Sequence, residues 1–276
     1  MMDMLLFPFQ LDFMRNAFLV MLLIAPAAGM LSALLVLKGW SLMGDAVSHA
    51  VLPGIVLAYV AGLPLILGAF GAGLFCAVAA GHLRETSRIK ADTAMGVVFA
   101  GMFGLGIVLY TAIESDLHLD HILFGNMLGV GAGDLWTAGL IAGGVALALL
   151  VAWRALMAQA FDPVQAHALG LPVRLLHYGL LAALSATIVA MLSSVGLVLS
   201  IAILIAPGAT AFLLVRRFAA MMAVAVLLTA GAGVAGVYAS FWIDSAPAPT
   251  IVLILTGLFL LALVRHGWRA RAQAAA

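Results

Sequence analysis

The chain has 276 residues, of which 66% are hydrophobic and 8% are charged, and its formal net charge is +1. The charged side chains are too few to form the surface of a soluble protein of this length. The composition therefore predicts an integral membrane protein whose solvent is the lipid bilayer. The near-neutral charge and the lack of a dense basic stretch argue against a nucleic-acid partner. The single cysteine, Cys76, excludes an internal disulfide and a cysteine metal cluster.

Nine segments are long and apolar enough to cross a bilayer, which takes about 20 residues each. Because several are joined by tight turns, eight spans plus a re-entrant segment also fit the pattern. Residues 1–16 lack the basic region of a signal peptide, so we expect a short interfacial helix there. No polar linker divides the chain, and we predict one all-α transmembrane domain over residues 1–276. The spans lie at roughly 17–37, 41–61, 63–82, 94–113, 134–155, 175–193, 196–214, 219–241 and 250–264.

Charge predicts the orientation of these spans. If the loop at 82–90 faces the cytoplasm, alternation puts eleven of the twelve basic residues on that side and leaves only Arg15 on the other. The loops on the opposite side carry acidic residues and no lysine or arginine. Since cytoplasmic loops carry an excess of basic residues, we expect the N-terminus outside and the C-terminus inside.

The second span contains the segment SLMGDAVSHAVLPG, which places Asp45 and His49 four residues apart. Residues at i and i+4 share one helix face, and Ser48 joins them. At the rise of an α-helix, Asp45 lies roughly 8 Å and His49 roughly 14 Å inside the bilayer. A charged aspartate at that depth costs about 3 kcal/mol or more unless it has a partner or a water-filled path.

Two interpretations of this pair remain open. One is a neutral hydrogen bond that joins two helices. The other, which we favour, is a transport site, because a carboxylate oxygen and an imidazole nitrogen suit divalent manganese, iron or zinc. Two ligands from one chain hold an ion weakly, and a second chain related by symmetry would supply two more.

The loop after the fourth span has the sequence ESDLHLDHILFGN, which carries two aspartates and two histidines within six residues. It could gather cations at the mouth of the path or contact a partner, whereas an ordinary solvated acidic loop is the more common explanation for such a cluster. The four residues are Asp116, His118, Asp120 and His121.

The segment at 158–174 carries signals for a short helix between spans. Asp162 can cap its start, Pro163 suits its first position, and Gly170 ends it. Such a helix could be an interfacial connector or a contact for a cytoplasmic partner. In the last external loop, FWIDSAPAPT, Asp244 and Pro247 belong to a stiffened segment that suits the docking of a protein.

The segment LKGWSLMGDAVSHAVLPGIVLAYVAG resembles the permease subunits of bacterial ABC importers for manganese, iron and zinc. The resemblance continues in order through KADTAMGVVFAGMFGLGIVL, DHILFGNMLGV, FDPVQAHALGLPVRLLHYGLL, GLVLSIAILIAPGATAFLL and FWIDSAPAPTIVL. It implies a multi-pass protein of the bacterial plasma membrane. The implied partners are a second permease copy or paralogue, two cytoplasmic ABC ATPases and an extracytoplasmic metal-binding protein.

The resemblance also implies roles for single residues. Asp45 and His49 match the family's metal ligands in the translocation path, with no permanently bound cofactor. The segment at 158–174 matches the coupling helix that contacts the ATPase, and Ala166 and Leu169 would form its contact face. No GxxxxGK[ST] phosphate loop occurs, so ATP is expected to bind and be hydrolysed on another chain.

Three other functions fit the sequence less well. A secondary proton- or cation-coupled metal transporter would also use a buried aspartate and histidine but would not need a capped cytoplasmic helix. An intramembrane metalloprotease would need a motif such as HExxH, and the chain has no His-Glu dipeptide. A permease for cobalamin or siderophores would have no use for a paired aspartate and histidine.

Overall fold

The computed structural model describes residues 7–40, 42–88, 91–113 and 125–274. Every regular element in these ranges is a helix. This is expected for a chain in lipid, because a helix satisfies its own backbone hydrogen bonds without water. Nine helical stretches within the described residues are long and apolar enough to cross a membrane, in agreement with the nine predicted spans.

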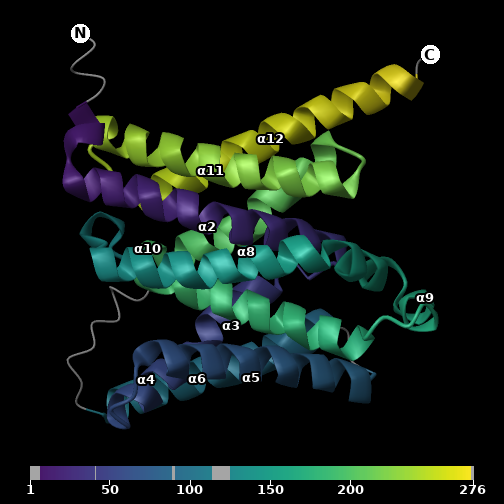
Figure 1. The fold of residues 1–276 in the computed structure, drawn as a ribbon, viewed down its shortest axis with the longest axis horizontal. Helices are drawn as coiled ribbons and strands as arrows, with labels where there is room; N and C mark the ends of the chain where they lie inside the picture. The colour runs from purple at the N-terminus through teal and green to yellow at the C-terminus, as the bar shows by residue number, and fades with distance from the viewer. Residues whose placement is uncertain (1–6, 41, 89–90, 114–124, 275–276) are drawn as a thin grey trace.

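The long helices lie roughly horizontally in Figure 1 and are stacked in layers from the top of the view to the bottom. At one edge lie α11 (Phe218–Ile243) and α12 (Pro247–Ala274), and at the other lie α4 (Leu52–Val60), α5 (Leu65–Thr86) and α6 (Ala91–Ala112). Between them are α2 (Asp12–Leu37), α3 (Met43–Ala50), α8 (Ala132–Phe161) and α10 (Val173–Leu214), with the short helices η1 (Met127–Gly129) and α9 (Pro163–Ala168) at their ends.

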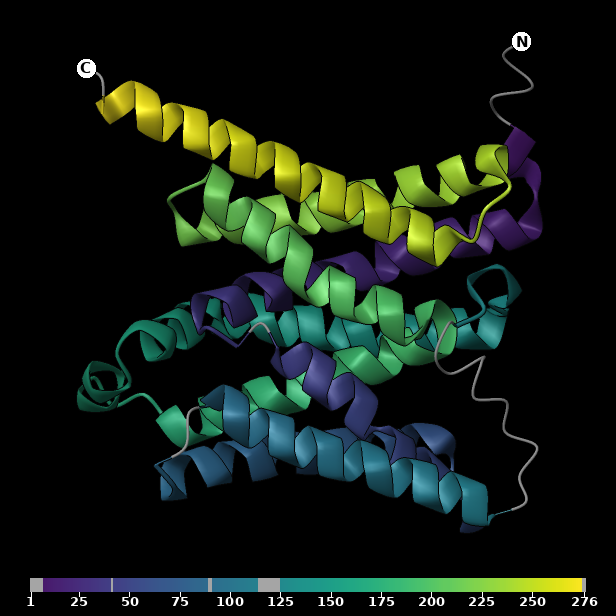
Figure 2. The ribbon, with the colours of Figure 1, turned by 180° about the vertical axis from the view of Figure 1, so that it is seen from behind.

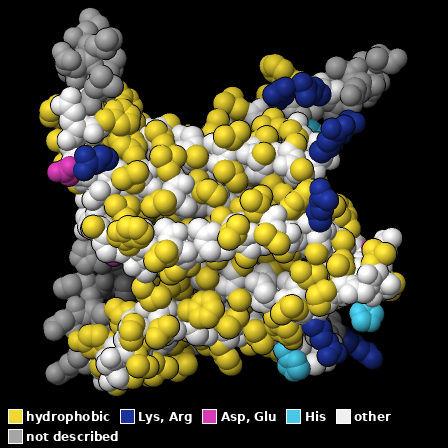
Figure 3. Space-filling view, in the orientation of Figure 1, with side chains coloured by type: hydrophobic (Ala, Val, Ile, Leu, Met, Phe, Trp, Pro, Cys, Tyr) yellow, Lys and Arg dark blue, Asp and Glu magenta, His cyan; other side chains and the backbone are white. Residues whose placement is uncertain are grey.

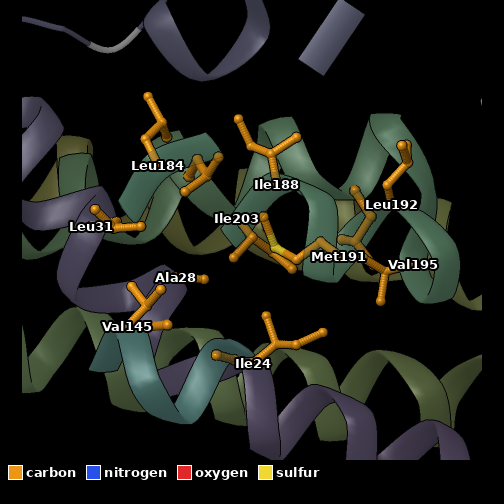
Figure 4. Packing of buried hydrophobic residues seen from close by; sticks show 14 of the residues in the cluster. Ile24, Ala28, Leu31, Val145, Leu184, Ile188, Met191, Leu192, Val195 and Ile203 are labelled. Carbon is orange, nitrogen blue, oxygen red and sulfur yellow. The ribbon is translucent and has the colours of Figure 1, made fainter. Parts of the chain in front are cut away.

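The core of the molecule forms where α2, α8 and α10 meet. Figure 4 shows the side chains of Ile24, Leu31, Val145, Ile188 and Ile203 packed against one another from these three helices. Small residues bring other helices into direct backbone contact. A Cβ added to Gly29 of α2 would lie 2.6 Å from the Cα of Val226 on α11, so only glycine permits this crossing.

The second span is not one uninterrupted helix. A turn at Val51 separates α3 from α4, and Pro53 lies in the first turn of α4. A second interruption occurs inside α10, where Gly196 adopts φ 77° and ψ 176° and divides the element into two spans. A positive φ of this kind favours glycine, and it allows the chain to return across the molecule.

The start of the chain differs from the prediction of an interfacial helix over residues 1–16. Within the described residues, 7–10 are helical, but residues 12–16 belong to α2 and continue directly into the first span. Arg15 and Asp12 form an exposed ion pair of 3.0 Å on the first turns of α2. This i, i+3 pairing lets two charges extend the helix beyond its apolar part.

Basic side chains gather at one end of the molecule. Both ribbon views place α9, the C-terminal end of α12 and the connection between α10 and α11 at this end. Figure 3 shows most of the visible Lys and Arg side chains there, while hydrophobic side chains cover the surface between the two ends. The arrangement matches the asymmetry of charge expected from the sequence.

Candidate functional site

The candidate metal site lies on α3, which both ribbon views place between the two ends of the molecule. His49 Nε2 is 3.4 Å from Asp45 Oδ1, so the two side chains meet across one turn of the helix. Both are partly open: 39% of the Asp45 side chain and 26% of the His49 side chain remain accessible. A partly open carboxylate inside a membrane span needs water, an ion or another chain to cover it.

The separation of these two atoms bears on the choice between a hydrogen bond and a shared ion. A charge-assisted hydrogen bond between nitrogen and oxygen is about 2.7–2.9 Å long. Two ligand atoms that each lie about 2.1 Å from one ion are roughly 3.0 Å apart in octahedral and roughly 3.4 Å apart in tetrahedral geometry. The observed 3.4 Å is long for a tight hydrogen bond and falls within the range for adjacent metal ligands.

The imidazole of His49 packs against two neighbouring aromatic rings of α6. Its centroid lies 5.5 Å from that of Phe99 and 5.4 Å from that of Phe103. Its Nδ1 atom is buried and has no hydrogen-bond partner among the described residues. The ring therefore directs Nε2, and not Nδ1, toward Asp45 and the open side.

Ser48 does not belong to the open polar strip, although the sequence placed it on the same face. Its side chain is only 1% exposed, and its hydroxyl donates to the Gly44 carbonyl at 2.7 Å. A serine that bonds to its own helix in this way is already satisfied. The open strip thus consists of Asp45 and His49.

The described part of the chain brings only Asp45 and His49 together as candidate ligands. No group of three or more His, Cys, Asp or Glu side chains that could hold a metal occurs in the part of the chain that the structure describes. Asp116, His118, Asp120 and His121, the second candidate set, lie outside the described residues. Among the described residues, the carboxylate and imidazole of α3 are therefore two candidate donors of different hardness.

The short helix α9, at the basic end of the molecule, begins with the cap and the proline that the sequence predicts. The Asp162 carboxylate accepts hydrogen bonds from the Val164 and Gln165 amides, each 2.9 Å long, and Pro163 is the first residue of α9. Such a cap satisfies amides that a helix leaves free at its start.

The end of α9 is equally well defined. Gly170 has φ +77°, the Leu171 amide donates to the Ala166 carbonyl, and the Gly170 amide donates to the His167 carbonyl. These bonds form the Schellman arrangement that closes many helices at a glycine. Gly170 therefore acts by ending the helix.

The predicted contact face of α9 needs correction. Leu169 is 69% exposed, as expected, but Ala166 is only 1% exposed and faces the interior of this chain. The way α9 sits against the bundle buries Ala166, so its short side chain cannot contact a partner. The exposed apolar side chains of this corner are Phe161, Val164 and Leu169, the first two of which the sequence did not single out.

The loop between α11 and α12, which the sequence predicts to be external, also differs in part from the prediction. Asp244 is exposed and adopts a left-handed conformation with φ 54°, where it ends α11. Pro247 is the first residue of α12 and is buried, because the start of that helix packs into the bundle. Pro247 therefore cannot present a docking surface, whereas Asp244 can.

Comparisons with known proteins agree with this architecture. Residues 10–266 match the ABC 3 transport family. The chain is 52% identical to the chelated iron transport system membrane protein YfeD of Yersinia pestis over 93% of this chain and 86% of the relative. It is 42% identical to the manganese transport system membrane protein MntB of Synechocystis over 93% of this chain and 84% of that relative.

Among solved structures, PsaBC from Streptococcus pneumoniae in complex with Fab contains a chain with a TM-score of 0.85 and 34% identity, and 95% of each chain is covered. A putative metal-chelate type ABC transporter in an inward-facing conformation has a TM-score of 0.72 at 15% identity, which shows a shared fold. On the match over nearly its whole length, the chain belongs to the ABC 3 transport family.

Proposed function

We propose that this protein is the membrane-spanning permease of an ATP-driven importer that moves divalent manganese or iron into a bacterial cell. The observation that carries the proposal is the Asp45–His49 pair, which lies half-open on α3 between the two ends of the molecule. Its relatives include membrane proteins of a chelated iron and a manganese transport system, which supports the choice of ion. Zinc uses similar ligands and is the third candidate.

The two side chains suit an ion that crosses without a full hydration shell. The carboxylate of Asp45 supplies a charged oxygen, and His49 supplies a nitrogen of intermediate softness. Phe99 and Phe103 fix the imidazole so that Nε2 stays beside the carboxylate. A site with few ligands releases its ion readily, which suits transport better than storage.

A second permease, either a copy or a paralogue, would complete this site. It would cover the half-open Asp45 and His49 side chains and add an equivalent pair across a symmetry axis, giving four donors. Covering by protein also removes the cost of leaving a carboxylate beside lipid.

We place the two ATPases at the basic end of the molecule. Phe161, Val164 and Leu169 are exposed apolar side chains on and beside the capped helix α9. A few side chains that fill well-packed pockets on a partner contribute most of the affinity of an interface. An extracytoplasmic metal-binding protein would contact the opposite end, where Asp244 is exposed.

Reconstitution tests the function directly. The permease, its ATPase and its binding protein in proteoliposomes should take up radiolabelled manganese with ATP and lose uptake when the ATPase carries a substitution that blocks hydrolysis. Competition with iron and zinc ranks the ions. Uptake that does not depend on ATP hydrolysis but does depend on a proton gradient would contradict the proposal.

Cysteine labelling tests the orientation. A cysteine in place of Arg88, in a Cys76→Ala background, should react with a membrane-impermeant reagent only after the cells are opened, because the basic loops are expected inside. Rapid labelling of intact cells would reverse the topology.

A further inference from the structure

Gln159, near the end of α8, is a buried polar residue that neither the metal site nor the surface of α9 uses. Its side chain is 4% exposed. Its Oε1 accepts a hydrogen bond of 3.3 Å from Lys38 Nζ, and its Nε2 donates one of 3.0 Å to the Val173 carbonyl. A buried amide that satisfies both ends holds its partners in fixed positions.

Most buried hydroxyls of the bundle bond within one helix, and those of Ser32 and Ser185 each join two helices. The hydroxyls of Ser48, Thr210 and Thr229 bond to carbonyls of their own helices. Gln159 instead joins three separate segments: the end of α8, the start of α10 and the residue that follows α2. Two of these segments are the ones that enter and leave α9.

The third segment leads to the metal site. Lys38 lies 4.3 Å from the centre of the Trp40 ring, and the Trp40 carbonyl accepts a hydrogen bond of 2.9 Å from the Met43 amide at the start of α3. Asp45 follows two residues later. A short series of contacts therefore connects both sides of α9, through Gln159, to the helix that carries Asp45.

A cavity beside these contacts leaves room for the residues that make them to move. A cavity of about 420 Å³ is lined by Lys38, Trp40, Met43, Gln159 and Pro163, among others. Densely packed interiors resist displacement, so an open volume at this junction leaves room for the α2–α3 turn to move against α9. The hydrogen bonds would carry the movement across a region that packing does not fill.

We propose that Gln159 is a positioning residue that transmits movement of α9 to the α2–α3 turn and thereby to the Asp45–His49 pair. The inference rests on the proposed function, in which an ATPase moves α9. Gln159 contacts neither metal nor nucleotide in this scheme. Its effect is on how much transport each hydrolysed ATP produces.

The test compares three variants in proteoliposomes that contain the complete complex. Gln159→Leu removes both hydrogen bonds at similar volume, and Lys38→Met removes the partner on the side of α3. Thr229→Val serves as the control, because it removes a buried hydroxyl on α11 away from this junction. The readouts are manganese transported per ATP hydrolysed and the thermal stability of the complex.

We expect Gln159→Leu to lower the transport per ATP by between about twofold and thirtyfold, the range found for residues that couple distant sites. ATP hydrolysis should continue, and Thr229→Val should leave the ratio unchanged. The double variant Gln159→Leu/Lys38→Met should be no worse than the more affected single variant, because both substitutions break one linkage. If Gln159→Leu does not assemble, Lys38→Met carries the same test.

If the assembled Gln159→Leu complex transports as much manganese per ATP as the wild type, the inference is wrong, even if the stability of the complex falls. If Gln159→Leu does not assemble, the same result in Lys38→Met overturns the inference. A purely structural role predicts that outcome. Since the wild-type complex is measured in parallel, the two proposals fail differently. Uptake by the wild type that needs no ATP hydrolysis refutes the proposed function, whereas ATP-driven wild-type uptake with an unchanged variant ratio refutes only the role of Gln159.

Discussion

Helix α9 and the Asp45–His49 site differ in whether a single chain supplies all of their contacts. In α9, the cap at Asp162 and the closing bonds at Gly170 are all made within the chain. On α3, the two proposed ligand side chains are 39% and 26% exposed, and no group of three possible ligands occurs among the described residues. In the proposed function, α9 is complete within one chain, whereas the metal site is completed only by a second permease.

Loss of the carboxylate should have the largest effect. Asp45→Asn keeps the size of the side chain and removes its charge, so we expect manganese uptake to fall by more than about tenfold, since even groups that only support metal ligands cost 10–100-fold. His49→Gln should impair uptake as well. The measurement is radiolabelled manganese uptake at matched membrane levels.

Ser48→Ala is the matched control for that comparison, because its hydroxyl is buried and bonded to Gly44. It should retain most uptake. If Asp45→Asn instead transported at a near-normal rate, the pair would be a structural contact between side chains, since an amide can replace a neutral hydrogen bond.

A charge on the exposed face of α9 should have the next largest effect. Leu169→Arg puts a cation where we expect an apolar pocket of the ATPase, and loss of an interface hot spot costs about 2 kcal/mol or more, or roughly thirtyfold in affinity. Co-purification of the ATPase and its stimulated hydrolysis report the change. Trp268→Arg, at a residue of similar exposure on α12 (71% against 69%), should leave both intact. Equal losses for the two variants would place the contact elsewhere or make it non-specific.

Removal of the helix cap should have the smallest effect. Asp162→Ala leaves the Val164 and Gln165 amides without their acceptor and should destabilise α9 by about 1 kcal/mol. Hydrogen exchange at α9 should quicken while the membrane helices stay protected, and Asp162→Asn should largely restore protection because it also caps well. Unchanged exchange in Asp162→Ala would show that packing alone holds α9.

The sequence predicted the features that depend on local chemistry. Nine spans follow from the length of apolar segments, and α9 follows from Asp162, Pro163 and Gly170, because capping acts over a few residues. The Asp45–His49 contact follows from their i, i+4 spacing. Each of these needs no knowledge of which helices are neighbours.

Features that depend on packing between distant segments could not be predicted. Burial of Ala166 and Pro247 follows from how α9 and α12 sit against the bundle. The spacing of Phe99 and Phe103 puts them on one face of α6, but nothing in the sequence shows that this face meets His49. The bonds from Gln159 to Lys38 and Val173 join residues 121 and 14 positions apart, which leaves no local pattern.

The number of manganese ions bound by the purified permease is the most direct test of a site shared between two chains. Equilibrium binding with radiolabelled manganese, in a complex locked by an ATPase that cannot hydrolyse ATP, should give about one ion for each pair of permease chains. The Asp45→Asn complex, assembled to the same extent, should bind no ion at that concentration. One ion on every separate chain, or full binding by Asp45→Asn, would contradict the assignment of Asp45 and His49 as a shared site.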